Sequence, residues 1–194
     1  MKIHLRDLNA ALVTAWCDWI GNSRVSFTAV DGAVGDPADA GATAVVSPAN
    51  SFGIMDGGID LSYARRWTGI EDAVRARIAR ECLFSELLVG QAIFVPIPGA
   101  SATKSLIVAP TMRVPMRIID PADVYLATRV AVRCAQEHNV DSLAIPGMGT
   151  GCGGVAPTVA AHAMMQGIMH ALGAAPRPES MGEASRLHWE FQRR

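Results

Sequence analysis

Short apolar runs alternate with longer segments of helical periodicity along most of this chain, and this alternation restricts the possible folds more than any other feature. The predicted strands are Lys2–Leu5, Val25–Val30, Ala44–Ser47, Ala92–Ile97, Leu106–Pro110 and Ser142–Ile145. The runs AIFVPI and SLAI are almost continuously apolar, which is typical of strands covered on both faces. The sequence therefore predicts an α/β fold, a three-layer α/β/α sandwich with a mixed, largely parallel central sheet.

The predicted helices carry start and stop signals. They cover Asn9–Ile20, a segment starting near Thr68, a segment opening at Asp120, and a last segment from about Pro157 to Leu172. Thr68 and Glu71 have the spacing of a capping box at the start of the second helix. Asp120 is expected to cap the third helix, with Pro121 at its first position. Gly173 is the expected C-cap of the last helix.

Composition predicts one folded domain followed by a polar tail. The chain has 194 residues, of which 50% are hydrophobic and 18% are charged, so it can bury a sizeable core and is not disordered as a whole. After Gly173 the sequence becomes polar, and Pro176 and Pro178 interrupt regular structure. We therefore predict a domain over residues 1–173 and a tail over residues 174–194, with a short helix near Leu187–Phe191.

Charge and cysteine content argue against several classes of function. The formal net charge is -1, without the basic surplus that a general nucleic-acid-binding surface needs. The four cysteines are far apart and have no histidine at zinc-ligand spacing, so we expect no metal site and no cofactor. They are Cys17, Cys82, Cys134 and Cys152. The chain shows neither a signal-peptide core nor an apolar run of about 18 residues. It is therefore expected to be cytoplasmic, with free thiols and no membrane contact.

The loop within Leu143–Pro157 carries five glycines between positions 147 and 154. Glycine allows the backbone to approach a ligand closely, and free amides at the start of a helix bind phosphate oxygens. Thr150 can add a hydroxyl donor. A tight turn without a ligand is the alternative, although two glycines would suffice for one. A dinucleotide-binding or P-loop motif is not expected, because the required downstream acid and the Gly-Lys pair are both missing.

A second loop, within Val45–Gly69, supplies polar side chains after another apolar strand. The Asn50 amide can donate to and accept from a sugar hydroxyl, or it can simply stabilise a turn. Asp56 either belongs to the site or caps the following helix. Asp60 faces either solvent or the ligand cleft. Because ligands bind beyond the carboxyl ends of strands in open α/β sheets, we expect the two loops to form one site.

Together the two loops resemble the signatures of the macro domain, an ADP-ribose-binding family. The first signature stands here as V-S-P-A-N, ending at Asn50, followed by G-G-I-D, ending at Asp60; the second stands as P-G-M-G-T-G-C-G-G-V-A-P. The order and spacing of elements agree over about Val25–Leu172. The variant S-P-A-N-S-F-G-x-M-D-G-G-I-D is similar to that of a bacterial and phage subgroup.

The resemblance implies a role for each matching position. Asn50 would contact the distal ribose of ADP-ribose. The first loop would line the ligand with Gly57, Gly58 and Ile59, and the second would wrap the diphosphate with Gly149, Thr150, Gly151, Cys152 and Gly153. Family members hold the adenine amino group with an Asp in a G-D segment. Asp36 is the preferred match here, and Asp31 is its rival.

Departures from the family pattern bear on catalysis. Gly153 stands where an aromatic residue often stacks on the distal ribose, and Ser47 replaces the first Asn of the motif. Asp60 matches the Asp of the hydrolytic branch, but Ala64 stands where that branch has His. These differences are compatible with ligand binding and leave no evident general acid.

Three functions follow as hypotheses. The first is binding of ADP-ribose, either free or attached to a protein or nucleic acid. The second is an ADP-ribosyl hydrolase, in which Asp60 activates a water molecule and Asn50 fixes the ribose. The third is an interaction module that has kept the fold without the ligand.

Overall fold

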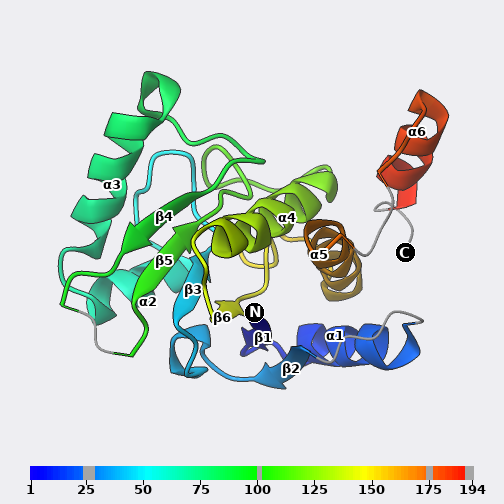
Figure 1. Ribbon diagram of the computed structural model, residues 1–194, viewed down its shortest axis with the longest axis horizontal. Helices are drawn as coiled ribbons and strands as arrows, with labels where there is room; N and C mark the ends of the chain where they lie inside the picture. The colour runs from blue at the N-terminus through cyan, green and yellow to red at the C-terminus, as the bar shows by residue number, and fades with distance from the viewer. Residues whose placement is uncertain (24–28, 100–101, 174–176, 191–194) are drawn as a thin grey trace.

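The computed structural model describes residues 1–194 except 24–28, 100–101, 174–176 and 191–194. Its strands are β1 (Lys2–Asp7), β2 (Val30–Val34), β3 (Ala44–Ser47), β4 (Ile93–Pro96), β5 (Ser105–Val108) and β6 (Ser142–Ile145). Its helices are α1 (Ala10–Asn22), α2 (Gly58–Arg66), α3 (Ile70–Glu81), α4 (Ala122–Glu137), α5 (Pro157–Ala171) and α6 (Met181–Glu190), and two short 3-10 helices cover Pro37–Asp39 and Leu83–Ser85 (Figure 1).

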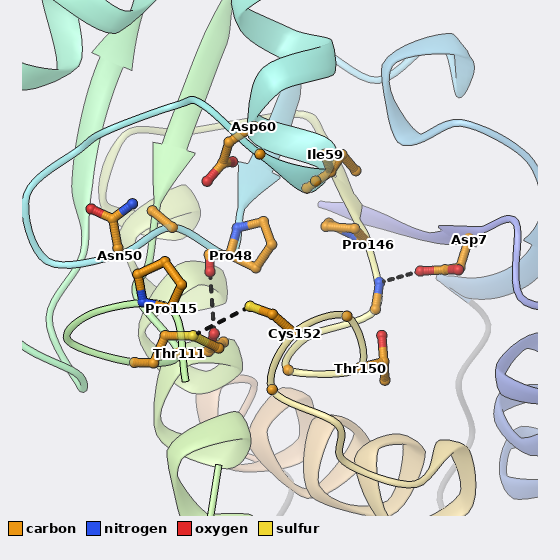
Figure 2. A pocket seen from close by; sticks show the side chains of 18 of the residues that line it. Asp7, Pro48, Asn50, Ile59, Asp60, Thr111, Pro115, Pro146, Thr150 and Cys152 are labelled. Atoms are coloured by element: carbon orange, nitrogen blue, oxygen red, sulfur yellow. Dashed lines mark hydrogen bonds between the residues drawn. The ribbon is translucent and has the colours of Figure 1, made fainter. Parts of the chain in front are cut away.

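The six strands form one sheet in the order β2-β1-β6-β3-β5-β4. All neighbouring pairs are parallel except β4 and β5, which are antiparallel. The predicted α/β class and mixed, largely parallel sheet are therefore confirmed. The segments that follow β1, β3 and β6 meet at one edge of the sheet (Figure 2).

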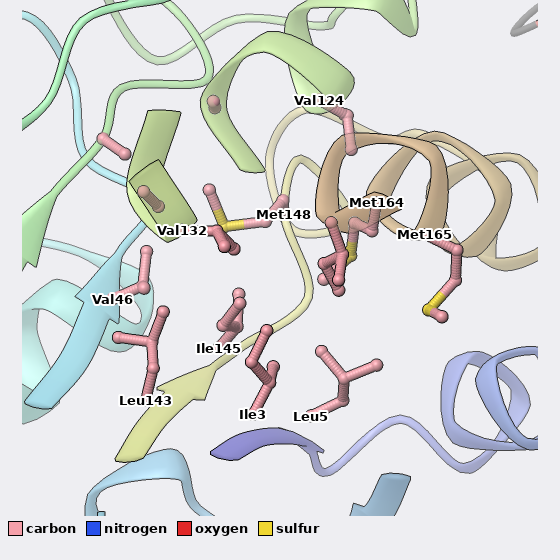
Figure 3. Packing of buried hydrophobic residues seen from close by; sticks show 14 of the residues in the cluster. Ile3, Leu5, Val46, Val124, Val132, Leu143, Ile145, Met148, Met164 and Met165 are labelled. Carbon is pink, nitrogen blue, oxygen red and sulfur yellow. The ribbon is translucent and has the colours of Figure 1, made fainter. Parts of the chain in front are cut away.

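Successive strand residues point to opposite faces of the sheet, and here both sets are apolar. Helices therefore cover both faces. On β3, Val46 packs in the larger apolar cluster with residues of α1, α4 and α5 (Figure 3). Its neighbour Val45 packs in the second cluster, which includes Tyr63 of α2 and Ile70 of α3. This two-sided burial explains why the strands read as continuous apolar runs in the sequence.

Strand boundaries agree best in the middle of the sheet, where β6 and β3 are neighbours. β3 and β6 have the predicted bounds, whereas β1 continues to Asp7 because Arg6 and Asp7 pair with the end of β2. β4 is one residue shorter than predicted at each end, and β5 starts one residue earlier and ends two residues earlier than predicted. Of the predicted strand Val25–Val30, residues 25–28 lie outside the described part, and β2 starts at Val30.

Two predicted helix starts are wrong in detail. α3 begins at Ile70 behind Gly69, whose φ of 81° makes it a left-handed N-cap without a side-chain hydrogen bond, so the Thr68 capping box does not form. α4 begins at Ala122, so Pro121 is the residue before the helix rather than its first residue. The expected acidic cap is present, since the Asp120 carboxylate accepts a hydrogen bond from the Ala122 amide at 2.9 Å.

The last two helices also differ slightly from the prediction. α5 ends at Ala171, and Leu172 is its C-cap. Gly173 follows with a φ of 73°, one position later than expected for the cap itself. α6 is longer than the predicted tail helix, and its exposed surface leaves no residue fully buried. Among the described residues, no helix is long and apolar enough to cross a membrane.

Candidate functional site

A cavity of about 770 Å³ lies where the carboxyl ends of the central strands meet (Figure 2). Four segments line it: residues 7–9 at the end of β1, residues 48–60 after β3, residues 111–115 after β5, and residues 146–153 after β6. This is the edge at which an open parallel sheet binds ligands. The volume is that of an ordinary small-molecule site.

The cavity brings together all of the predicted site residues except Asp36. They are Asn50, Gly57, Gly58, Ile59, Asp60, Gly149, Thr150, Gly151, Cys152 and Gly153. The two glycine-bearing loops therefore form one site although about 90 residues separate them in the sequence. Asp56, for which the sequence allowed either a role in the site or a role as helix cap, also lines this cavity.

Unpartnered backbone amides are the main polar feature of the loop after β6. Within the described part of the chain, the N–H groups of residues 149–153 have no hydrogen-bonded partner. The loop closes on itself only beyond them, where Gly154 N–H donates to Gly151 C=O at 3.0 Å and Val155 N–H donates to Gly149 C=O at 3.1 Å. Gly149 has a φ of 73°, which a residue with a Cβ rarely adopts. These amides are free to bind an anion.

The start of α2 adds a second group of donors. Gly57 is its N-cap and provides no side-chain hydrogen bond, so Asp56 does not cap the helix. The first helical bond runs from Leu61 N–H to Gly57 C=O at 3.2 Å. The amides of Gly58, Ile59 and Asp60 therefore precede the hydrogen-bond ladder. Their partial positive charge faces the same cavity as the second loop.

Asn50 holds its own turn as well as lining the cavity. Its Nδ2 donates to Ile54 C=O at 2.7 Å, and its Oδ1 accepts from the amides of Phe52 and Ile54 at 3.0 and 3.3 Å. In the structure, the Asn50 side chain therefore stabilises a turn, which is one of the two roles expected from the sequence. The side chain lies at the same end of the cavity as Asp60 (Figure 2).

Asp60 lies in the first turn of α2 and is 8% exposed. Ser47 Oγ, at the end of β3, donates a hydrogen bond to its Oδ1 at 2.6 Å. Burial raises the pKa of this carboxyl group to about 6, and the Ser47 hydrogen bond partly offsets that effect. A carboxyl group with a raised pKa inside a cavity is characteristic of functional sites.

The acidic residues expected near adenine lie elsewhere. Asp36 Oδ1 accepts from Ala38 N–H at 2.8 Å and so caps a 3-10 helix. Asp31 contacts His4 Nδ1 at 2.8 Å and forms an ion pair with Arg6. Neither carboxylate is among the residues that line the cavity.

Asp7 lines the cavity although sequence reasoning did not select it. Its Oδ2 accepts from Gly147 N–H at 2.9 Å, and its Oδ1 accepts from Asn9 N–H at 2.8 Å. The side chain thus ties the end of β1 to the loop after β6 (Figure 2). The only sequence signal was an acid immediately after an apolar strand. Thr111, Met112 and Pro115 were missed too.

The cavity lining is acidic rather than basic. It includes Asp7, Asp56 and Asp60, and none of the residues identified around the cavity is Lys, Arg or His. An anionic ligand would therefore be held by backbone amides. Among the described residues, no group of three or more His, Cys, Asp or Glu side chains could hold a metal ion.

Comparison with known proteins identifies the family. A family model described as Macro domain matches residues 46–164, which is more than half of the chain. This chain belongs to the macro domain family. The match includes both glycine-bearing loops of the cavity, the last two residues of β3 and the whole of β6.

Two uncharacterized proteins are sequence relatives of this macro domain. An uncharacterized protein of Aquifex aeolicus (strain VF5) is 38% identical over 127 residues, which are 66% of this chain and 73% of that protein. An uncharacterized protein of Aeropyrum pernix is 34% identical over 124 residues. That match covers 63% of this chain and 61% of the relative.

Solved macro domains have a similar fold. The macrodomain of Mycobacterium tuberculosis DarG has a TM-score of 0.59 and 25% identity, and the match covers 72% of this chain and 87% of that one. The Oceanobacillus iheyensis macrodomain with ADP has a TM-score of 0.62 and 19% identity, with coverages of 82% and 87%. Thermosipho africanus DarTG in complex with ADP-ribose has a TM-score of 0.58 and 14% identity, with coverages of 78% and 42%.

Proposed function

We propose that the cavity binds ADP-ribose, either free or attached to a macromolecule. The observation that carries this proposal is the row of unpartnered amides at residues 149–153, facing the open start of α2. A diphosphate brings two negative charges, and oriented amides can bind them without a basic side chain. The solved macro domains from Oceanobacillus iheyensis with ADP and Thermosipho africanus with ADP-ribose support this ligand class.

The affinity required is within reach of such a site. Hydrogen bonds to charged groups contribute roughly 1.5–3 kcal/mol each. Four or five of them offset much of the entropy lost on association, so a micromolar dissociation constant, about -8 kcal/mol, needs no arginine or lysine. The acidic side chains around the cavity repel other polyanions and therefore reduce their non-specific binding.

The polar groups suggest an orientation for the ligand. Asp60 offers a carboxylate acceptor for ribose hydroxyls at the end of the cavity where Asn50 also lies, so we assign the terminal ribose to that end. Asp7 lies at the other end, near Ile59 and Pro146. A carboxylate beside apolar side chains suits the adenine amino group and ring, so we assign to Asp7 the adenine contact that the family resemblance implied for Asp36.

Calorimetry with Gly151→Glu tests the binding proposal. A Cβ at Gly151 meets no atom within 4 Å, and its φ is not in the left-handed region, so the variant should fold normally. The carboxylate would occupy the diphosphate site and repel the ligand. We expect wild type to bind ADP-ribose and the variant to lose at least a hundredfold in affinity, about 2.7 kcal/mol.

Gly151→Ala is the matched control, since it adds one methyl group in the same open space. It should keep most of the affinity. Absence of heat and of a thermal shift for wild type at millimolar ADP-ribose would favour a ligand-free interaction module. Unchanged affinity in Gly151→Glu would mean that the ligand binds away from this loop.

Removal of ADP-ribose from a modified target is a second candidate function, favoured by the buried Asp60 carboxyl group in the cavity. Asp60 would accept a proton from a water molecule as that water attacks the anomeric carbon. The bond to the target breaks, and the leaving group takes up a proton from solvent. Asp60→Ala should then slow release at least a hundredfold, an effect typical of losing a general base, and lower ADP-ribose affinity at most about tenfold. Equal rates for variant and wild type would contradict this role.

We also propose that the protein works in a reducing compartment such as the cytoplasm. Its four cysteines are all free, and two of them, Cys17 and Cys152, are exposed. Exposed thiols persist where disulfides do not form.

A further inference from the structure

A buried serine, Ser47, contacts the carboxyl group of Asp60 in the cavity. Ser47, the last residue of β3, is 1% exposed, and its hydroxyl donates to Asp60 Oδ1 across to helix α2. We propose that Ser47 is a positioning residue of this site, whose hydroxyl orients the Asp60 carboxylate so that its second oxygen is presented, charged, to the terminal ribose. The proposal rests on the ADP-ribose site described above and adds a residue to it.

The two carboxylate oxygens of Asp60 have different surroundings. Oδ1 has the serine hydroxyl at 2.6 Å, whereas Oδ2 has no hydrogen-bonded partner within the described residues. Oδ2 is also not among the fully buried polar atoms that lack a partner, and Asp60 lines the cavity. Figure 2 shows the carboxyl group directed into the cavity, on the side of Asn50. One oxygen is therefore anchored and the other is open to a ligand.

The serine hydroxyl is the main group that favours the charged form of Asp60. Tyr63, one turn along α2, is buried and donates its own hydroxyl to Val46 C=O at 3.3 Å, not to Asp60. Arg66, a further turn along, is engaged with Asp39 at 2.7 Å. The carboxylates of Asp7, Asp36 and Asp56 approach this region from the strand ends and the loop before α2. None of these side chains offsets the burial of Asp60, and Ser47 is the side-chain donor that lowers its pKa, which burial raises to about 6.

Orientation and charge both affect what the free oxygen can bind. A carboxylate accepts stronger hydrogen bonds from hydroxyl groups or water than a neutral acid does. Without the serine donor, the carboxyl group would rotate more freely and its pKa would rise further, because a hydrogen bond to the charged form would be lost. At neutral pH a larger fraction of Asp60 would then be protonated, and contact with a ribose hydroxyl would weaken.

Titration of the Asp60 carboxyl carbon by NMR, in wild type and in Ser47→Ala, measures this effect directly. The midpoint should rise by about one to two pH units in the variant, as expected for the loss of a hydrogen bond to a charged group. Calorimetry should show ADP-ribose binding about threefold weaker than wild type at pH 7.5, and equal to wild type at pH 5, where both proteins carry a protonated Asp60. A merely structural role would weaken binding equally at both pH values.

Ser51→Ala is the matched control. Ser51 is as buried as Ser47 and lies on the same segment, and its hydroxyl has no hydrogen-bonded partner in the described part of the chain. This variant should leave the Asp60 midpoint and the affinity unchanged. Ser47→Thr should restore the wild-type midpoint because it keeps the hydroxyl. Ser47→Cys, which fills the same volume with a weak donor, should behave like Ser47→Ala and replaces it if that variant does not fold.

The outcomes separate this proposal from the function on which it rests. If wild type binds ADP-ribose and Ser47→Ala has an unchanged midpoint, the positioning role is overturned and the binding function stands. If the midpoint rises but no protein binds ADP-ribose at any pH, the serine supports Asp60 and the proposed ligand is wrong.

Discussion

The carboxyl group of Asp60 is buried without a cation beside it, so keeping it ionised costs stability at neutral pH. Its pKa is about 6 in the folded chain, against an ordinary value of 3.8. Between these two values the folded state binds more protons than the unfolded state, so stability falls as pH rises through that window. A shift of about two pH units corresponds to about 3 kcal/mol as an upper bound.

Asp60→Asn should therefore stabilise the protein in a pH-dependent way. Asn keeps an acceptor for the Ser47 hydroxyl and removes the charge. Denaturant unfolding should show a gain of up to about 3 kcal/mol at pH 7.5 and almost none at pH 3.5, where wild-type Asp60 is protonated. An equal gain at both pH values would mean that the carboxylate charge is not what destabilises wild type.

At the residue level, local sequence patterns identified residues within the two loops, but they did not identify contacts between residues that are far apart in the sequence. Asn50, Asp60 and the glycines were selected because each follows an apolar strand or precedes a helix within one short segment. Asp7 could not be selected in this way, since its contact with Gly147 joins residues 140 positions apart. The Ser47–Asp60 hydrogen bond was equally hidden, because it depends on the position at which α2 meets the end of β3.

Helix α6 is the element least integrated with the rest of the molecule (Figure 1). Its Leu187 packs, partly buried, against the larger apolar cluster. His188 Nε2 lies 3.4 Å from Asp120 Oδ2 on the surface. None of the residues identified around the cavity comes from this helix.

Removal of residues 174–194 should leave a cooperatively folding domain. One half-buried leucine and one exposed ion pair contribute little, so we expect a loss of less than about 2 kcal/mol in unfolding free energy. ADP-ribose affinity should stay within twofold of the full chain, as measured by calorimetry. A tenfold loss of affinity, or a broad non-cooperative transition, would show that the tail belongs to the domain instead.

The strands predicted with the correct bounds are β3 and β6, the two in the middle of the sheet, and their bounds match the apolar runs. The predicted start of α3 was wrong because Gly69, in a left-handed conformation, is the N-cap instead of Thr68. Which residue becomes the N-cap depends on the path of the chain between α2 and α3. α2 itself was expected only as a helix after Asp56, since its opening residues Gly57 and Gly58 are weak helix formers.

At the scale of the whole molecule, the fold class could be predicted from the sequence, but the order of the strands in the sheet could not. Alternation of strands and helices indicates a layered α/β fold, but it does not say which strands are neighbours. β1 lies between β2 and β6, and β6 comes near the end of the ordered domain. That order depends on tertiary packing, in which helices α1, α4 and α5 share one apolar cluster with β1 and β6.

This central place of β1 has a consequence for biosynthesis. Within this domain β1 is synthesised before β6, its neighbour on one of its two edges, and about 140 residues separate the two strands. Until β6 is available, that edge of β1 is unpaired and open to wrong pairing, a hazard that nascent-chain chaperones counter. The cavity forms only after the second glycine loop has been synthesised, and therefore late in the folding of the domain.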